Sequence, residues 1–152
     1  MNKTEAQRLW NALCGATCKP GTRAPYDSVM YSEGNLYATD SYMIHRVHGL
    51  YDLRVNLIRI MHASEIVTAS HGVRYNLERF FDVKLSDTLS NTYYDPKLFY
   101  KAMRPHYSFN DNAAIQLQSS TEKNGPLFIR STHIDGDVVI TIDTCLAGKK
   151  VR

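Results

Sequence analysis

Leu36-Tyr37-Ala38-Thr39-Asp40-Ser41-Tyr42-Met43-Ile44-His45 is the stretch of this chain that says most about its fold. It follows a glycine-containing turn at residues 32–35, which apolar runs flank on both sides. Short polar side chains at residues 39–41 can bond to nearby backbone groups and therefore favour a bend. Residues 42–47 then alternate with period two, which gives a strand two distinct faces. The pattern predicts three consecutive strands within residues 26–48.

Two other segments carry the signals of amphipathic helices. Residues 4–17 place apolar side chains at helical spacing, and Thr4 followed by Gln7 fits a capping box. The second helix is expected to begin at Asp95, a good N-cap, with Pro96 in its first turn and Pro105 at its end. Its expected apolar side is formed by Leu98, Phe99, Ala102 and Met103.

Further strands are expected in the C-terminal third of the chain. The three strand-like runs are residues 113–118, 127–132 and 137–142. Asp135-Gly136 separates the last two runs and is a strong hairpin signal. The middle of the chain is less regular, with a strand-like alternation at residues 53–60 and a short helical pattern at residues 76–83. Together these elements predict an α+β fold.

The composition fits a single globular domain that spans residues 1–152. The chain is 43% hydrophobic and 22% charged, and its formal net charge of +3 permits contact with a polyanion without requiring it. No apolar run approaches the roughly 18 residues of a membrane span, and no signal-peptide pattern opens the sequence. We therefore expect a cytoplasmic protein without membrane association. Cys14, Cys18 and Cys145 are then expected to be reduced thiols.

The sequence offers no catalytic or metal-binding constellation. His45 and His48 lie three apart on a predicted strand, so their side chains point to opposite faces and cannot share one metal ion. Asp40 is better explained as a residue that stabilises a bend than as a general base. The eight glycines form no phosphate-binding motif. These observations predict no enzyme, no cofactor and no metal. A small enzyme that uses His45 or His133 is a remote alternative.

The basic residues of the second predicted helix are the strongest candidates for a binding site. Lys97, Lys101 and Arg104 follow one another at i, i+4 and i+7, which places them on one side of a helix, away from its apolar residues. A helix with a core face and a basic face can lie along a phosphate backbone without reading bases. The plain alternative is a solvated helix surface. Arg8 adds a basic residue to the first helix.

The order of these elements resembles one domain of the bacterial DNA polymerase III beta sliding clamp family. In that family a helix leads to a hairpin whose second strand enters a Thr-Asp bend, as Ala38-Thr39-Asp40-Ser41 does here. A second helix and further strands follow, similar to Asp95-Pro96-Lys97-Leu98 and Gly125-Pro126-Leu127-Phe128-Ile129. The similarity covers most of residues 4–50 and 93–145. Residues 51–92 are longer than the usual link and are expected to be an insertion.

The resemblance implies a DNA-clamp-like domain, with two helices packed on one face of a curved antiparallel sheet. It implies sequence-independent binding of double-stranded DNA through Arg8, Lys97, Lys101 and Arg104, and a DNA polymerase or another replication protein as partner. A clamp chain carries three such domains and two chains close its ring, so a ring here needs a homo-oligomer of about six copies. Such a single-domain processivity factor fits a phage or a mobile element. The partner-peptide pocket of the family lies between domains and has no counterpart that can be mapped here.

A second hypothesis belongs to another functional class. A clamp-fold protein can serve as a protein-interaction module that does not encircle DNA, with residues 51–92 as its binding surface. Such a module is expected to be monomeric or dimeric and to bind duplex DNA weakly or not at all.

Overall fold

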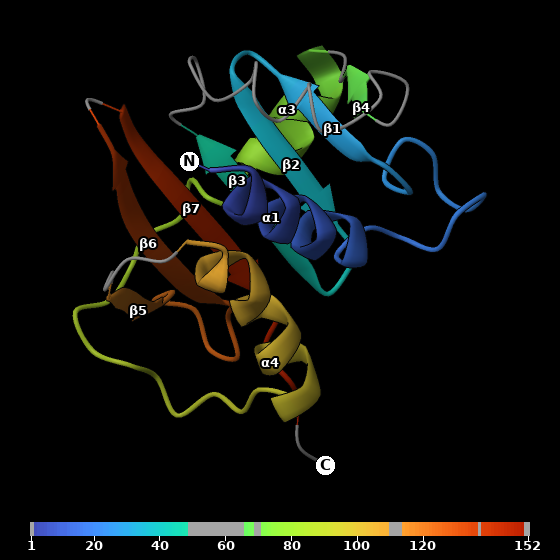
Figure 1. Cartoon of the computed structure of the whole chain (residues 1–152). Coiled ribbons are helices and arrows are strands. Elements are labelled where there is room, and N and C mark those ends of the chain that lie inside the picture. The colour runs from blue at the N-terminus through green and yellow to red at the C-terminus, as the bar shows by residue number, and fades with distance from the viewer. Residues whose placement is uncertain (1, 49–65, 69–70, 110–113, 137, 151–152) are drawn as a thin grey trace.

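The computed structural model describes residues 2–48, 66–68, 71–109, 114–136 and 138–150 (Figure 1). Its helices are α1 (Lys3–Gly15), α3 (His71–Glu78), α4 (Pro96–Met103) and the 3₁₀ helix η2 (Arg104–Tyr107). Its strands are β1 (Val29–Ser32), β2 (Asn35–Thr39), β3 (Met43–His48), β4 (Ile66–Thr68), β5 (Ile115–Ser119), β6 (Leu127–Asp135) and β7 (Val138–Leu146).

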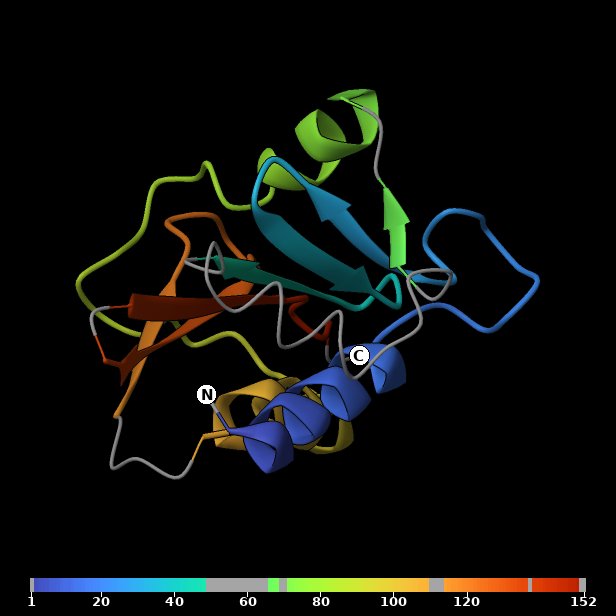
Figure 2. The same cartoon turned by 45° about the horizontal axis from the view of Figure 1, so that its top comes forward.

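The strands in the described part of the chain form one sheet in the order β4-β1-β2-β3-β7-β6-β5. From β1 to β5 in that order all neighbours are antiparallel, whereas β4 joins the edge of β1 in parallel. Helices α1 and α4 cover one face of the sheet, and α3 lies on the other face (Figures 1 and 2). The expected α+β class is confirmed, and the two helices predicted from sequence share one face.

The first hairpin and the bend after it follow from local chemistry. Glu33 and Gly34 both have positive φ, 46° and 87°, as a tight two-residue hairpin turn requires. In the bend, the Asp40 carboxylate accepts hydrogen bonds from the backbone N–H of Tyr42 at 2.9 Å and of Met43 at 3.0 Å. The segment that carries the family resemblance therefore forms the three strands that its pattern predicts.

The core lies in two layers because strand residues alternate between the faces of the sheet. On one side, Leu9 and Leu13 of α1 pack in a cluster with Ile142 of β7, and all three are fully buried. Further along that side, α4 contributes Ala102 and Met103 to a second cluster. On the other side, the buried Leu77 of α3 anchors a third cluster.

Two helix boundaries differ from those expected. The capping box of α1 is formed by Asn2 and Glu5 rather than by Thr4 and Gln7, and α1 ends at Gly15 rather than at residue 17. Asn2 is the N-cap because its side chain accepts a hydrogen bond from the Glu5 N–H at 2.9 Å. The Glu5 carboxylate in turn accepts one from the Asn2 N–H at 3.0 Å. The expected boundaries of the second helix, with Asp95 as N-cap, are confirmed.

The helix expected at residues 76–83 was wrong in position, because α3 spans His71–Glu78. Val73 and Leu77 lie four residues apart on the side of α3 that packs against the sheet, and the chain then turns so that Phe81 lies under the Arg46 guanidinium. The strand expected at residues 53–60 lies outside the described residues. The described part of the expected insertion, residues 51–92, contains β4 and α3.

In the described part of the chain, no helix has both the length and the apolar character that crossing a membrane requires.

Candidate functional site

Helices α1 and α4 bring the predicted DNA-binding residues to one face of the molecule. Both helices lie on the same face of the sheet (Figure 2), and α1 contacts η2, the continuation of α4. The Arg104 guanidinium of η2 approaches Gly15 of α1 so closely that a Cβ there would lie 3.3 Å from it. Lys97 and Arg104 are exposed on the α4–η2 segment, and Arg8 is exposed on α1. Arg8, Lys97 and Arg104 are therefore exposed residues of elements that lie on the same face of the sheet.

Lys101 forms an ion pair with a residue of another element. Its Nζ lies 3.2 Å from the Asp40 carboxylate, in the bend between β2 and β3, and its side chain is 38% exposed. The Asp40 side chain is 10% exposed, so this ion pair is partly shielded from water. Lys101 therefore shares its charge with the bend and presents less of it to a ligand than its position on the helix predicts.

The acidic groups that α1 and α4 themselves contribute lie at their N-termini. The Glu5 carboxylate serves the capping box of α1. The Asp95 carboxylate accepts from the N–H groups of Lys97 at 2.8 Å and Leu98 at 3.3 Å, and these hydrogen bonds lower its pKa. Because α1, α4 and η2 contain no other acidic residue, their exposed surfaces are basic or neutral away from the caps.

Two exposed aromatic side chains on the same face were missed from the sequence. Tyr100 of α4 is 74% exposed and Tyr107 of η2 is 67% exposed. The available signal was their interleaving with Lys97 and Arg104, at positions 97, 100, 104 and 107.

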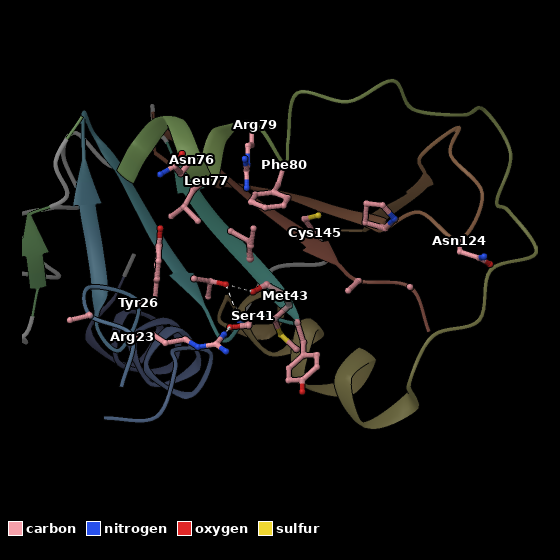
Figure 3. Close-up of a pocket in the computed structure, with 17 residues that line it drawn as sticks. Arg23, Tyr26, Ser41, Met43, Asn76, Leu77, Arg79, Phe80, Asn124 and Cys145 are labelled. Atoms are coloured by element: carbon pink, nitrogen blue, oxygen red, sulfur yellow. Dashed lines mark hydrogen bonds between the residues drawn. The ribbon is translucent and has the colours of Figure 1, made fainter. Parts of the chain in front are cut away.

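A pocket of about 710 Å³ lies on the α3 side of the sheet (Figure 3). Leu77 and Phe80, from α3 and the turn after it, face Cys145 of the sheet across this space. Ile44 of the sheet also lines the pocket. No local sequence signal indicated it, since its walls come from residues far apart in the chain. Its full lining is Arg23, Ala24, Tyr26, Thr39, Ser41, Tyr42, Met43, Ile44, Asn76, Leu77, Arg79, Phe80, Asn124, Pro126, Cys145, Ala147 and Gly148.

The pocket has a basic lining and an uncommon backbone conformation at Ser41. Arg23 and Arg79 are its charged lining residues, and none of its lining residues is acidic. Arg23 donates to the Ser41 hydroxyl at 2.7 Å, and Ser41 has a φ of 80°, a conformation that is uncommon for a residue other than glycine. Asn76, Leu77, Arg79 and Phe80 belong to the segment expected to be an insertion.

A chain of buried polar groups lies between the sheet and the helices α1 and α4. The Thr144 hydroxyl lies 2.7 Å from His45 Nδ1 and 2.8 Å from His106 Nε2. The Ser131 hydroxyl lies 2.6 Å from His106 Nδ1 and 2.9 Å from His133 Nε2. Burial lowers the pKa of His45 to about 3 and that of His106 to about 4. These imidazoles are therefore neutral partners of buried hydroxyl groups at neutral pH.

The opposite face of the sheet carries an ionic cluster around Asp143. Arg130 makes two hydrogen bonds to its carboxylate, at 2.6 and 3.1 Å, and Arg46 and His48 contact it at 2.7 and 3.1 Å. Burial opposes ionisation, but these hydrogen bonds hold the pKa of Asp143 well below its usual range. His45 and His48 therefore point to opposite faces of β3, as the sequence predicts.

Among the described residues, no three His, Cys, Asp or Glu side chains form a group that could hold a metal ion. Cys14, Cys18 and Cys145, which all lie in that part, form no disulfide.

Comparison with protein-family models, with curated proteins and with solved structures finds no match to this chain.

Proposed function

We propose that this chain is a sliding-clamp-like DNA-binding protein that holds double-stranded DNA against α1 and α4 without catalysis. The observation that carries the proposal is the shared face of the two helices, whose exposed surfaces are basic or neutral away from their N-caps. Cations on such a face bind phosphates irrespective of sequence, and each contact releases counterions from the DNA. The protein can then slide along the duplex instead of locking onto one site.

The arrangement of the sheet is compatible with assembly into a ring. β4 and β5 are the edge strands of the sheet, on opposite sides, and edge strands can pair between subunits. A closed ring of about six copies places every α1 and α4 toward a central channel, as in the clamp family. Its partner would be a DNA polymerase or another replication protein.

Charge reversal on the helical face tests the proposal. Arg8, Lys97 and Arg104 are the residues to replace with Glu, since a carboxylate at position 101 would be repelled by Asp40 and disturb the bend. We expect the triple variant to lose duplex binding at low salt. In single variants the slope of log K against log[salt] should fall by about 0.9 per lost phosphate contact.

The matched control reverses three exposed lysines outside the helices, Lys84→Glu with Lys123→Glu and Lys150→Glu. It changes the net charge without touching the helical face and should retain most of the duplex affinity. If both variants lost duplex binding equally, binding would depend on the overall charge of the protein. The helical face would then have no specific role. Light scattering across a concentration series tests the ring, for which a species near six subunits is expected.

A second candidate function is that of a protein-interaction module, and the pocket on the α3 side favours it. An apolar space of this size that contains two arginines and no acidic side chain suits a short peptide with large apolar residues and a carboxylate. Phe80→Ala with Arg79→Glu should abolish binding of such peptides while leaving the helical face intact. A chain that stays monomeric or dimeric and fails to bind duplex DNA would favour this function over the first.

A further inference from the structure

Tyr100 and Tyr107 are the large aromatic side chains that the helical face exposes most. They are 74% and 67% exposed, respectively. Within the described part of the chain, neither side chain has a hydrogen-bonding or aromatic partner. The packing of α4 depends instead on Ala102 and Met103, which are buried on its other side. The two rings therefore contribute little to the fold and are available to a ligand.

The rings alternate with two of the cations that define the helical face. Along α4, Lys97 and Tyr100 are three residues apart and Arg104 follows four residues later, so all three share one side of the helix. The chain then continues as the 3₁₀ helix η2, in which residues three apart eclipse each other, so Tyr107 lies in line with Arg104. The result is a stripe in the order cation, ring, cation, ring.

The chemistry of this stripe goes beyond what a duplex needs. Phosphates on a double helix require cations alone, and the bases of a duplex are stacked on one another and present no face to a protein side chain. A tyrosine ring gains from nucleic acid chiefly when a base is unpaired and can stack on it. Interleaved cations and aromatic rings are the common solution for single strands, because the cations follow the backbone and the rings take successive bases.

We propose that the stripe formed by Lys97, Tyr100, Arg104 and Tyr107 binds single-stranded DNA. Lys97 and Arg104 contact phosphates, while Tyr100 and Tyr107 each stack on one base. This inference rests on the proposed function, since it assigns a second form of DNA to the same helical face. A clamp-like protein with this stripe can hold the single strand next to a primer end as well as the duplex behind it.

Fluorescence anisotropy with labelled oligothymidylate and a duplex of equal length, both at low salt, tests the inference. Oligothymidylate is chosen because it forms little structure of its own. Stacking on a base contributes to the binding free energy. The double variant Tyr100→Ala with Tyr107→Ala should therefore weaken oligothymidylate binding by about tenfold or more. The same variant should change duplex binding by less than about twofold, since phosphate contacts remain.

Two further variants separate stacking from other effects. Tyr100→Phe with Tyr107→Phe keeps both rings and removes both hydroxyl groups, so it should retain the single-strand affinity. Tyr93→Ala removes a 65% exposed tyrosine that lies before α4 and should change neither affinity. Loss of single-strand binding in the phenylalanine variant would show hydroxyl contacts instead of stacking and would overturn the inference.

The two proposals fail in different ways. Duplex binding with no oligothymidylate binding by the unaltered protein overturns the single-strand inference and leaves the proposed function standing. Oligothymidylate binding that depends on the two rings, without duplex binding, supports the inference and overturns the duplex-holding function. An equal loss on both substrates in the alanine variant also overturns the inference, because the rings would then serve the fold or the duplex.

Discussion

Lowering the pH from 7 to 5 should destabilise this protein through the buried histidines under α1 and α4. His45 and His106 are both held beside the Thr144 hydroxyl, at 2.7 and 2.8 Å, and are almost completely buried. Their pKa values are about 3 and about 4, chiefly because burial disfavours the charged imidazolium. Electrostatic interactions lower both pKa values further, that of His45 through His106 and Lys101 and that of His106 through His133.

The sign and size of the effect follow from proton linkage. In the unfolded chain both histidines have the ordinary pKa of about 6.5, so between pH 6.5 and pH 4 the unfolded state binds more protons than the folded state. Unfolding free energy therefore falls as the pH falls through this window. Each histidine accounts for a loss of about 2 kcal/mol between pH 7 and pH 5, or about 4 kcal/mol together. That is roughly a quarter or more of the 5–15 kcal/mol typical of a domain.

Urea unfolding at pH 7, 6 and 5, followed by circular dichroism, measures this loss. Asp143 does not interfere, because its lowered pKa provides stability that is lost only when the pH falls below the ordinary aspartate pKa of about 4. An NMR titration of the histidines tests the same reasoning directly, because the imidazoles of His45 and His106 should stay neutral at pH 5. A flat unfolding free energy from pH 7 to 5, or titration of every histidine near pH 6.5, would refute the reasoning.

Substitutions at three aspartates test the remaining contacts. Asp95→Ala should lower the melting temperature by removing the N-cap of α4, whereas Asp95→Asn should retain most of it because asparagine caps equally well. Asp40→Asn removes the partner of Lys101, so duplex affinity should rise and the salt slope should steepen by about 0.9, which a salt titration of binding measures. Asp143→Ala should cost about 3 kcal/mol in urea unfolding, since it leaves two arginines without their partly buried carboxylate.

Elements with strong local signals could be predicted from the sequence. The hairpin turn at Glu33-Gly34, the bend at Asp40 and the N-cap at Asp95 each depend on side chains within a few residues of the backbone groups they serve. The start of α1 was displaced because Asn2 with Glu5 and Thr4 with Gln7 both match the same capping pattern. The structure shows that Asn2 and Glu5 form the reciprocal hydrogen bonds of the cap.

The contacts that shape the candidate site could not be predicted, because they join distant parts of the chain. The Lys101 ion pair with Asp40 spans 61 positions, and the contact between His45 and Thr144 spans 99. Helical spacing correctly places Lys97 and Lys101 on one helix, but it carries no information about a carboxylate from another element. The pocket has the same origin, since α3 and the sheet meet only in the folded chain.

The bend between β2 and β3 connects the two surfaces that the candidate functions use. Asp40 faces α4 and pairs with Lys101, next to the helical face. Its neighbours Thr39, Ser41 and Met43 line the pocket on the other side, where Arg23 bonds to Ser41. The Asp40 carboxylate also accepts two backbone N–H groups of the bend, so its position fixes both surfaces at once. A pocket ligand that changes the bend is therefore expected to alter the Lys101 ion pair. If DNA binds at Lys101 as proposed, linkage then changes the affinity at the pocket by the same factor.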